Sequence, residues 1–218
     1  MRNFRFIAVL CALVSAAAFA ESTADTAPSK DSLRLYYARA SDTDFVTVVA
    51  GDYNASRESD RLTGLNWGHE VGQHFFGKPI RMTANVGLQY IDERGLQPDA
   101  YGITSFIKAQ YLWRLPWTNK RVQLGLGEGL SYVTRIPKSE ERDFAKKNVE
   151  SNKLMNYLEW TVDVPLSQFE SLRPLLLHGP IKEINTGFMV WHRSSVFGLF
   201  AETKGGINFM GFSVEARY

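Results

Sequence analysis

The chain has 218 residues, of which 13% are aromatic, and carries a formal net charge of +2. This length suits a single domain, and charges so close to balance argue against a nucleic-acid-binding protein, which would carry a basic excess. The sequence contains one cysteine, Cys11, so no disulfide framework is expected.

The first twenty residues have the order of features found in a secretory signal peptide. A short basic start with Arg2 and Arg5 precedes an apolar run over residues 6–14. Ala18-Phe19-Ala20 then fits the small-x-small cleavage rule, so we expect a cleaved signal peptide over residues 1–20. An uncleaved anchor is the alternative, but the apolar run is shorter than the ~20 residues that span a bilayer.

Removal of this leader changes both the charge and the cysteine content of the chain. Both arginines leave with it, so 23 basic and 23 acidic residues remain, and no nucleic-acid partner is expected. Cys11 also leaves, and it follows Leu10 instead of a small residue, which argues against a lipoprotein anchor. We expect a short disordered lead over residues 21–32 and one β-barrel domain over residues 33–218.

From Leu33 onward the side chains alternate with a period of two, and turn residues separate the alternating runs. The alternation predicts eight strands, near residues 33–51, 61–76, 80–92, 101–115, 121–135, 153–166, 182–194 and 206–217. The first is interpreted as one long or bent strand with a kink at residues 41–44, because bacterial single-chain barrels have an even number of strands.

The connections between these strands alternate in length. Tight turns are expected at residues 76–79 and 116–120, and longer polar loops at residues 52–60, 93–100, 137–152 and 195–205. Short periplasmic turns and longer outside loops are the layout of an outer-membrane barrel. Residues 167–180 fall where a short turn should be, and there we expect Leu175-Leu176-Leu177 to form an extra turn packed at the rim.

The two faces of the strands can be assigned from the same alternation. Over residues 153–166 the apolar face holds Leu154, Leu158, Trp160, Val162 and Val164, and the polar face holds Tyr157, Glu159, Thr161 and Asp163. After the leader, no apolar run is long enough for a membrane helix. The pattern therefore predicts an all-β fold, an eight-stranded antiparallel transmembrane β-barrel. A soluble, lipocalin-like barrel with a ligand inside is the alternative.

Three acidic residues stand out in the predicted strands. Glu159 and Asp163 face the interior, where charged side chains pair with arginine to fill the lumen of a small barrel. Glu128 falls on the apolar face of residues 121–132, so we expect a β-bulge nearby.

Other polar residues carry weaker signals. His69 and His74 lie five apart, on opposite faces of a strand, so no shared metal site is expected. Gly205-Gly206 lacks the surroundings of a nucleotide fingerprint and is interpreted as a turn, so no cofactor is expected. The mixed-charge run over residues 138–147 is interpreted as a solvated outside loop.

The most informative polar residues lie at the end of the seventh predicted strand. His192 and Ser194 are two apart, so they point to the same face, which is the face of the apolar residues before them. A polar pair directed at lipid is costly unless its groups find partners, and a function would explain it. Asn208 shares the parity of the apolar residues that follow it, so it lies on the outer face of the same hairpin. With both termini in the periplasm, this pair lies beside the outer leaflet.

These residue types suit ester hydrolysis. Ser194 is a weak nucleophile alone, and the imidazole of His192 can take its proton during attack on an ester carbonyl. The imidazole in turn needs a third group to orient it, for which Asn208 and Glu202 are the candidates. The alternative is a histidine of the interfacial girdle beside an ordinary loop serine.

Two stretches also resemble a known family. His192-Arg193-Ser194-Ser195 and the later Gly205-Gly206-Ile207-Asn208-Phe209-Met210-Gly211 resemble the lipid A 3-O-deacylases of the PagL type and the related acyloxyacyl hydrolases. Residues 127–132 and 154–160 resemble strands of the same wider family. The likeness covers about the last hundred residues well and the first half by pattern alone.

The resemblance implies an eight-stranded barrel whose serine and histidine lie on the lipid-facing side and hydrolyse the ester at position 3 of lipid A, releasing a 3-hydroxy fatty acid. The family's serine maps onto Ser194 and its histidine onto His192. The family's acid is a glutamate early in the last strand, where this chain has Asn208. Glu202 is the nearest acid, and it lies in the loop. The family's oxyanion hole would use backbone amides near Ser195 and the loop after it.

The resemblance also implies location and partners. The protein would lie in the cell outer membrane, with lipid A of lipopolysaccharide in the outer leaflet as its partner. The lysines of residues 138–147 could contact lipid A phosphates, and a homodimer stays open. The alternative function is a non-enzymatic outer-membrane barrel, structural or adhesive, that has lost the catalytic carboxylate.

Overall fold

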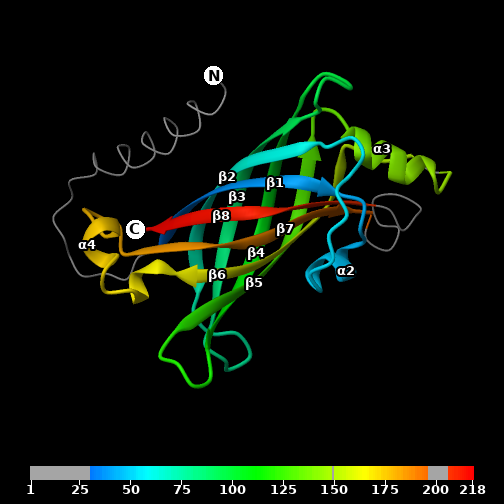
Figure 1. Ribbon diagram of the computed structural model, residues 1–218. Coiled ribbons are helices and arrows are strands. Elements are labelled where there is room, and N and C mark those ends of the chain that lie inside the picture. Colours follow the sequence, from blue (N-terminus) through cyan, green and yellow to red (C-terminus); the bar gives the residue numbers. More distant parts are fainter. Residues whose placement is uncertain (1–29, 149, 196–205) are drawn as a thin grey trace.

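The chain folds as a closed barrel of eight antiparallel strands (Figure 1). The computed structural model describes residues 30–148, 150–195 and 206–218. Each strand pairs with the next in sequence, and β1 closes the barrel by pairing with β8. The strands are β1 (Asp31–Ser41), β2 (Arg61–Gly72), β3 (Ile80–Asp92), β4 (Ala100–Arg114), β5 (Arg121–Val133), β6 (Leu154–Pro165), β7 (Glu183–Ser194) and β8 (Gly206–Arg217).

Short helices lie at the two ends of the barrel. Figure 1 shows α2 (Phe45–Val49) and α3 (Lys138–Ala145) at one end, and α4 (Arg173–Leu176) with the C-terminus at the other. The end with α2 and α3 carries the longer loops, which face outside in outer-membrane barrels, and is called the outer end below. Within the described residues, no helix combines the length and apolar character needed to cross a membrane.

The prediction for the first strand is wrong. β1 begins at Asp31, inside the expected lead, and ends at Ser41 instead of continuing to residue 51. The kink expected at residues 41–44 is the end of the strand, because the Asp44 side chain accepts a hydrogen bond from the Thr47 backbone N–H at 3.2 Å. This N-cap starts α2. The other seven strands lie where they were predicted, to within a few residues at each end.

The expected bulge near Glu128 is also wrong. β5 pairs in continuous register with β4 and with β6 on both sides of Glu128. An irregularity does occur between β2 and β3, where the register shifts between Glu70 and Gly72. Glu128 is therefore a regular outward-facing residue, a carboxylate on an apolar surface.

Residues 166–176 account for the long connection after β6. A 3₁₀ turn, η1 (Leu166–Gln168), is joined to β5 by two hydrogen bonds between the Gln168 amide and the backbone of Arg121, at 2.7 and 3.1 Å. The extra turn expected near Leu175 forms as α4, but the Leu175 side chain is 70% exposed and does not pack at the rim.

The surface and lumen of the barrel have the polarity of a membrane barrel. Large apolar side chains are exposed on the outside, including Leu88 at 62%, Leu126 at 52% and Phe212 at 71%. Charged side chains such as Arg34 and Glu159 are buried in the lumen. A soluble ligand-carrying barrel would have the opposite arrangement, so this distribution favours the transmembrane interpretation.

The lumen is filled by a network of ion pairs. Arg34 contacts Asp163 at 2.8 Å and Glu215 at 2.5 Å, and Lys108 contacts Glu159 at 2.6 Å. The expected arginine partner is thus confirmed for Asp163, whereas Glu159 pairs with a lysine. A cavity beside Arg34 and Lys108 has a volume of about 10 Å³, too small for more than one water. These charges plug the barrel and have a structural role.

We predict that Arg34→Leu destabilises the barrel, because it leaves Asp163 and Glu215 buried without their main cationic partner. Breaking a buried pair on one side costs about 3–5 kcal/mol. Urea titration of the protein in detergent, followed by heat-modifiable migration, measures the change. Arg39→Leu is the matched control, since Arg39 is an exposed residue of the same strand and should shift the free energy of unfolding by about 0.5 kcal/mol or less. Equal effects of the two variants would contradict the role of the network.

Candidate active site

The strand register brings five side chains and one glycine into one patch on the outer face of the barrel. His192 of β7 lies between Leu158 of β6 and Asn208 of β8. One step nearer the outer end, Ser194 lies between Asn156 and Gly206. Because all six positions share the outward parity, the five side chains meet on the surface that faces lipid.

His192 and Asn208 form the central contact of this patch. His192 Nδ1 lies 2.7 Å from Asn208 Oδ1, and Asn208 Nδ2 donates to the Thr43 carbonyl oxygen at 2.7 Å. The second bond orients the amide so that its oxygen faces the imidazole. An amide oxygen can only accept, so Nδ1 carries the hydrogen and Nε2 keeps the lone pair that can take up a proton.

The segment after β1 supports this pair from the side. The Phe45 ring of α2 packs on the His192 ring, with centroids 4.9 Å apart. Asp44 caps α2 through Thr47, and Thr43 supplies the carbonyl that holds Asn208. The end of β1 and the start of α2 therefore position both members of the pair.

Arg193 connects β7 to α3 through an ion pair. Its side chain points into the lumen and forms a fully buried ion pair with Glu140 at 3.0 Å. It also donates to the Asn152 carbonyl at 2.7 Å. Because Arg193 points inward, its two neighbours His192 and Ser194 must point outward.

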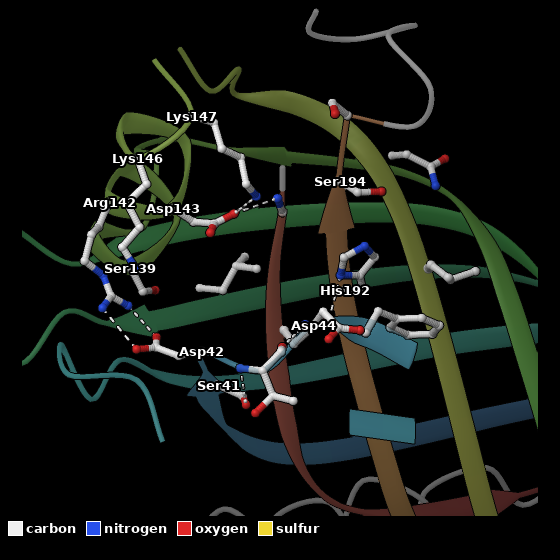
Figure 2. A pocket seen from close by; sticks show the side chains of 18 of the residues that line it. Ser41, Asp42, Asp44, Ser139, Arg142, Asp143, Lys146, Lys147, His192 and Ser194 are labelled. Atoms are coloured by element: carbon white, nitrogen blue, oxygen red, sulfur yellow. Dashed lines mark hydrogen bonds and ion pairs between the residues drawn. The ribbon is translucent and has the colours of Figure 1, made fainter. Parts of the chain in front are cut away.

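A cavity of about 520 Å³ opens in front of the patch, lined by α2, α3 and strands β6 to β8 (Figure 2). Arg142 of α3 pairs with Asp42, and Asp143 accepts from the Gly206 backbone N–H at 3.4 Å. Lys146 and Lys147 also line the cavity. The α3 helix thus forms a charged wall beside an otherwise lipid-facing surface.

Ser194 is near the imidazole but not bonded to it. Among the described residues no hydrogen bond joins Ser194 to His192, and Figure 2 shows the Ser194 side chain leaning from β7 toward β6. Gly206 keeps the space beside both residues open, since a Cβ there would lie 2.9 Å from His192 Cε1 and 3.2 Å from Ser194 Cβ. A rotation of the Ser194 side chain could bring its hydroxyl toward His192, and catalytic hydrogen bonds are often long without substrate.

The predicted site residues fall into two groups. His192, Ser194 and Asn208 come together as expected, whereas Glu202 lies outside the described residues. The support from Phe45 is not apparent in the sequence, because the alternation predicts a strand there. Asn156 also lines the site, and its outward parity between Leu154 and Leu158 is the signal in the sequence that could have identified it. Within the described residues no group of three or more His, Cys, Asp or Glu side chains could hold a metal ion.

Comparison with known proteins supports the fold. No protein family and no curated protein matches the sequence. Among solved structures, the outer membrane enzyme PagL superposes with a TM-score of 0.54 at 7% identity, over 84% of this chain and 97% of PagL. The Yersinia pestis outer membrane protein Ail, solved in a phospholipid bilayer nanodisc, gives a TM-score of 0.41 at 11% identity, over 88% of this chain and all of Ail (100%). The likeness to PagL shows that the chain has a PagL-type fold, that of an eight-stranded outer-membrane barrel.

We predict that the His192 imidazole is protonated at Nδ1 and not at Nε2, because Asn208 presents an acceptor to Nδ1. Nitrogen NMR of histidine-labelled protein in micelles reads the tautomer directly, and His192→Ala assigns the signal. In Asn208→Leu, which keeps the volume and removes the acceptor, the Nδ1–H preference should be lost. An Nε2–H tautomer in the wild type would contradict the assigned contact.

The docking of α3 depends on two buried acidic residues. Its first-turn amides are capped by two buried carboxylates: Lys138 N–H donates to Glu93 at 3.1 Å and Ser139 N–H to Asp60 at 3.1 Å. Burial, with the nearby charge of Asp60, raises the pKa of Glu93 to about 7. The folded state therefore binds the Glu93 proton more tightly than the unfolded state does. The bound proton stabilises the folded state fully at pH values below 4.5, the ordinary pKa of a glutamate. This stabilisation is lost as the pH rises to about 7.

Hydrogen exchange of the α3 amides, corrected for intrinsic rates, measures this effect. Protection should fall by roughly 10- to 100-fold between pH 5 and pH 8, because most of the rise of the Glu93 pKa from 4.5 to about 7 lies within this range. Glu93→Gln keeps an acceptor without the charge and should remove the difference. Glu170→Gln, an exposed carboxylate between η1 and α4 at the other end of the barrel, is the control. Equal pH dependence in wild type and Glu93→Gln would refute the prediction.

Proposed function

We propose that the protein is an outer-membrane serine esterase that removes the ester-linked acyl chain at the 3-O position of lipid A in lipopolysaccharide. Ser194 would be the nucleophile and His192 the general base. The observation that carries this proposal is the oriented His192–Asn208 pair, with Ser194 two residues away on the same lipid-facing surface. This is the nucleophile, base and orienting-group arrangement that acyl transfer needs.

The place of the site on the barrel supports a lipid substrate. His192 and Ser194 lie near the outer end of β7 and face outward, at the level where the outer leaflet would lie. The cavity of about 520 Å³ is within the range of small-molecule sites. It opens beside Leu158 and Phe45, which can contact an acyl chain, and the charged α3 wall can face a headgroup.

The sequence resemblance supports the reaction class. His192-Arg193-Ser194-Ser195 and the Asn208 region resemble the lipid A 3-O-deacylases, and the barrel has the PagL-type fold. The leader over residues 1–20 is outside the described residues, and we propose that it is a cleaved signal peptide that exports the chain.

The reaction proceeds in two acyl-transfer steps. Ser194 Oγ attacks the ester carbonyl carbon while its proton passes to His192 Nε2. The tetrahedral intermediate collapses, the C–O bond to the sugar breaks, and His192 returns the proton to the leaving alcohol. Water then attacks the acyl-serine with His192 again as base, which releases the fatty acid and restores Ser194.

Asn208 favours the alternative of a non-enzymatic barrel, structural or adhesive. An amide orients an imidazole but stabilises an imidazolium less than a carboxylate does. The proposal therefore implies a slower enzyme than one with a carboxylate at this position, and the test must be sensitive to low turnover.

Expression in a strain that makes 3-O-acylated lipid A tests the function. We expect mass spectrometry to show lipid A that has lost one 3-hydroxyacyl chain with the wild type, and intact lipid A with Ser194→Ala and with empty vector. Ser105→Ala, an exposed serine on β4, is the matched control and should keep the activity. Identical lipid A in all four strains would overturn the assignment.

A serine-directed lipid phosphonate separates the esterase from the non-enzymatic alternative. Ser194 should be labelled in purified wild-type protein, and labelling should fall by about 10²–10⁴ in His192→Ala, the usual contribution of a general base. Absence of labelling in folded wild-type protein would support a non-enzymatic barrel.

A further inference from the structure

Asn156 is the cross-strand neighbour of the proposed nucleophile. It lies on β6, and its Cα pairs with that of Ser194 in the antiparallel register. Directly opposite residues in such a pair have Cβ atoms about 4.5–5.5 Å apart. The Ser194 side chain leans toward the strand that carries Asn156 (Figure 2).

The Asn156 side chain lines the cavity. It makes no hydrogen bond with any described residue, and it is 8% exposed. It lies on the outward face between Leu154 and Leu158, where an amide loses its solvation without a gain in packing. Such a position points to a ligand as the missing partner.

The wall of the cavity places this amide beside the reacting atoms. Asn156 and Ser194 both line the cavity in front of His192. When Ser194 attacks an ester, negative charge develops on the carbonyl oxygen, and an N–H donor close to the nucleophile stabilises it. His192 and Asn208 lie one step away along β7 and β8, so an oxyanion on the β6 side would not displace the imidazole.

We infer that Asn156 is a further catalytic residue, whose side-chain N–H donates a hydrogen bond to the oxyanion formed when Ser194 attacks the ester. This inference rests on the proposed esterase function. It adds a donor from β6 to the backbone amides near Ser195 that the family resemblance implies. The proton of the serine still passes to His192, and Asn156 neither gains nor loses a proton.

The test measures how fast Ser194 reacts with two lipid phosphonates that differ only in P=O or P=S. The phosphoryl oxygen takes the place of the oxyanion, and sulfur is a poor hydrogen-bond acceptor. In Asn156→Ala, labelling by the P=O probe should fall about 10²–10³-fold, the usual loss for one oxyanion donor. The wild-type preference for P=O over P=S should fall toward that of the uncatalysed reaction.

Further variants distinguish a loss of reactivity from a folding defect. Asn156→Leu conserves volume and suits the lipid-facing position, so it should migrate as a folded barrel and still lose labelling. Asn156→Asp places a negative charge beside the oxyanion and should react more slowly than Asn156→Ala. Leu154→Ala, on the same face of β6, is the control and should react like the wild type.

The outcomes separate this inference from the proposed function. If wild-type Ser194 is not labelled, the esterase proposal fails and the inference fails with it. If the wild type is labelled but Asn156→Ala and Asn156→Leu react at the wild-type rate, the inference alone is overturned. The same holds if both variants react slowly while the preference for P=O stays unchanged, because Asn156 then acts through structure.

Discussion

The direction of one side chain, Arg193, determines where the candidate site lies. Arg193 stands between His192 and Ser194 and is fully buried at the outer end of the lumen, where Glu140 neutralises it. A slip of one residue in β7 would turn the guanidinium into lipid and bury both polar neighbours in the lumen. The ion pair with α3 therefore stabilises the same outward direction of His192 and Ser194 that the apolar face of the strand favours.

The same ion pair connects the barrel to the elements that make a cavity. A bare barrel wall is a smooth surface and does not enclose a ligand. The Arg193–Glu140 and Arg142–Asp42 ion pairs attach α3 to the rest of the protein. The Phe45 ring of α2 packs on the imidazole of His192. The loops thus convert three strands of the wall into a site with a lipid side and a charged side.

The asparagine at position 208 suits the position of the Thr43 backbone carbonyl. Asn208 accepts from His192 and donates to the Thr43 carbonyl at the same time, which a carboxylate could not do without placing two acceptors in contact. A neutral His–Asn pair also avoids the desolvation penalty of an ion pair in apolar surroundings. The disadvantage appears in the transition state, where an amide stabilises the imidazolium less well than a carboxylate does.

The sequence by itself determined the barrel and the direction of its side chains. The alternation over β2 to β8 predicted seven strands, the polar lumen and the outward parity of His192, Ser194 and Asn208, because the period of two follows from the strand backbone alone. It failed at residues 45–49, where alternation and one turn of helix look alike and the Asp44 cap decided for the helix. The cross-strand register, which joins Asn156 to Ser194 and Asn208 to His192, and the docking of α2 and α3 depend on contacts between residues far apart in the chain. The tertiary structure alone decided them, since no local pattern specifies which partner a side chain meets across a closed sheet.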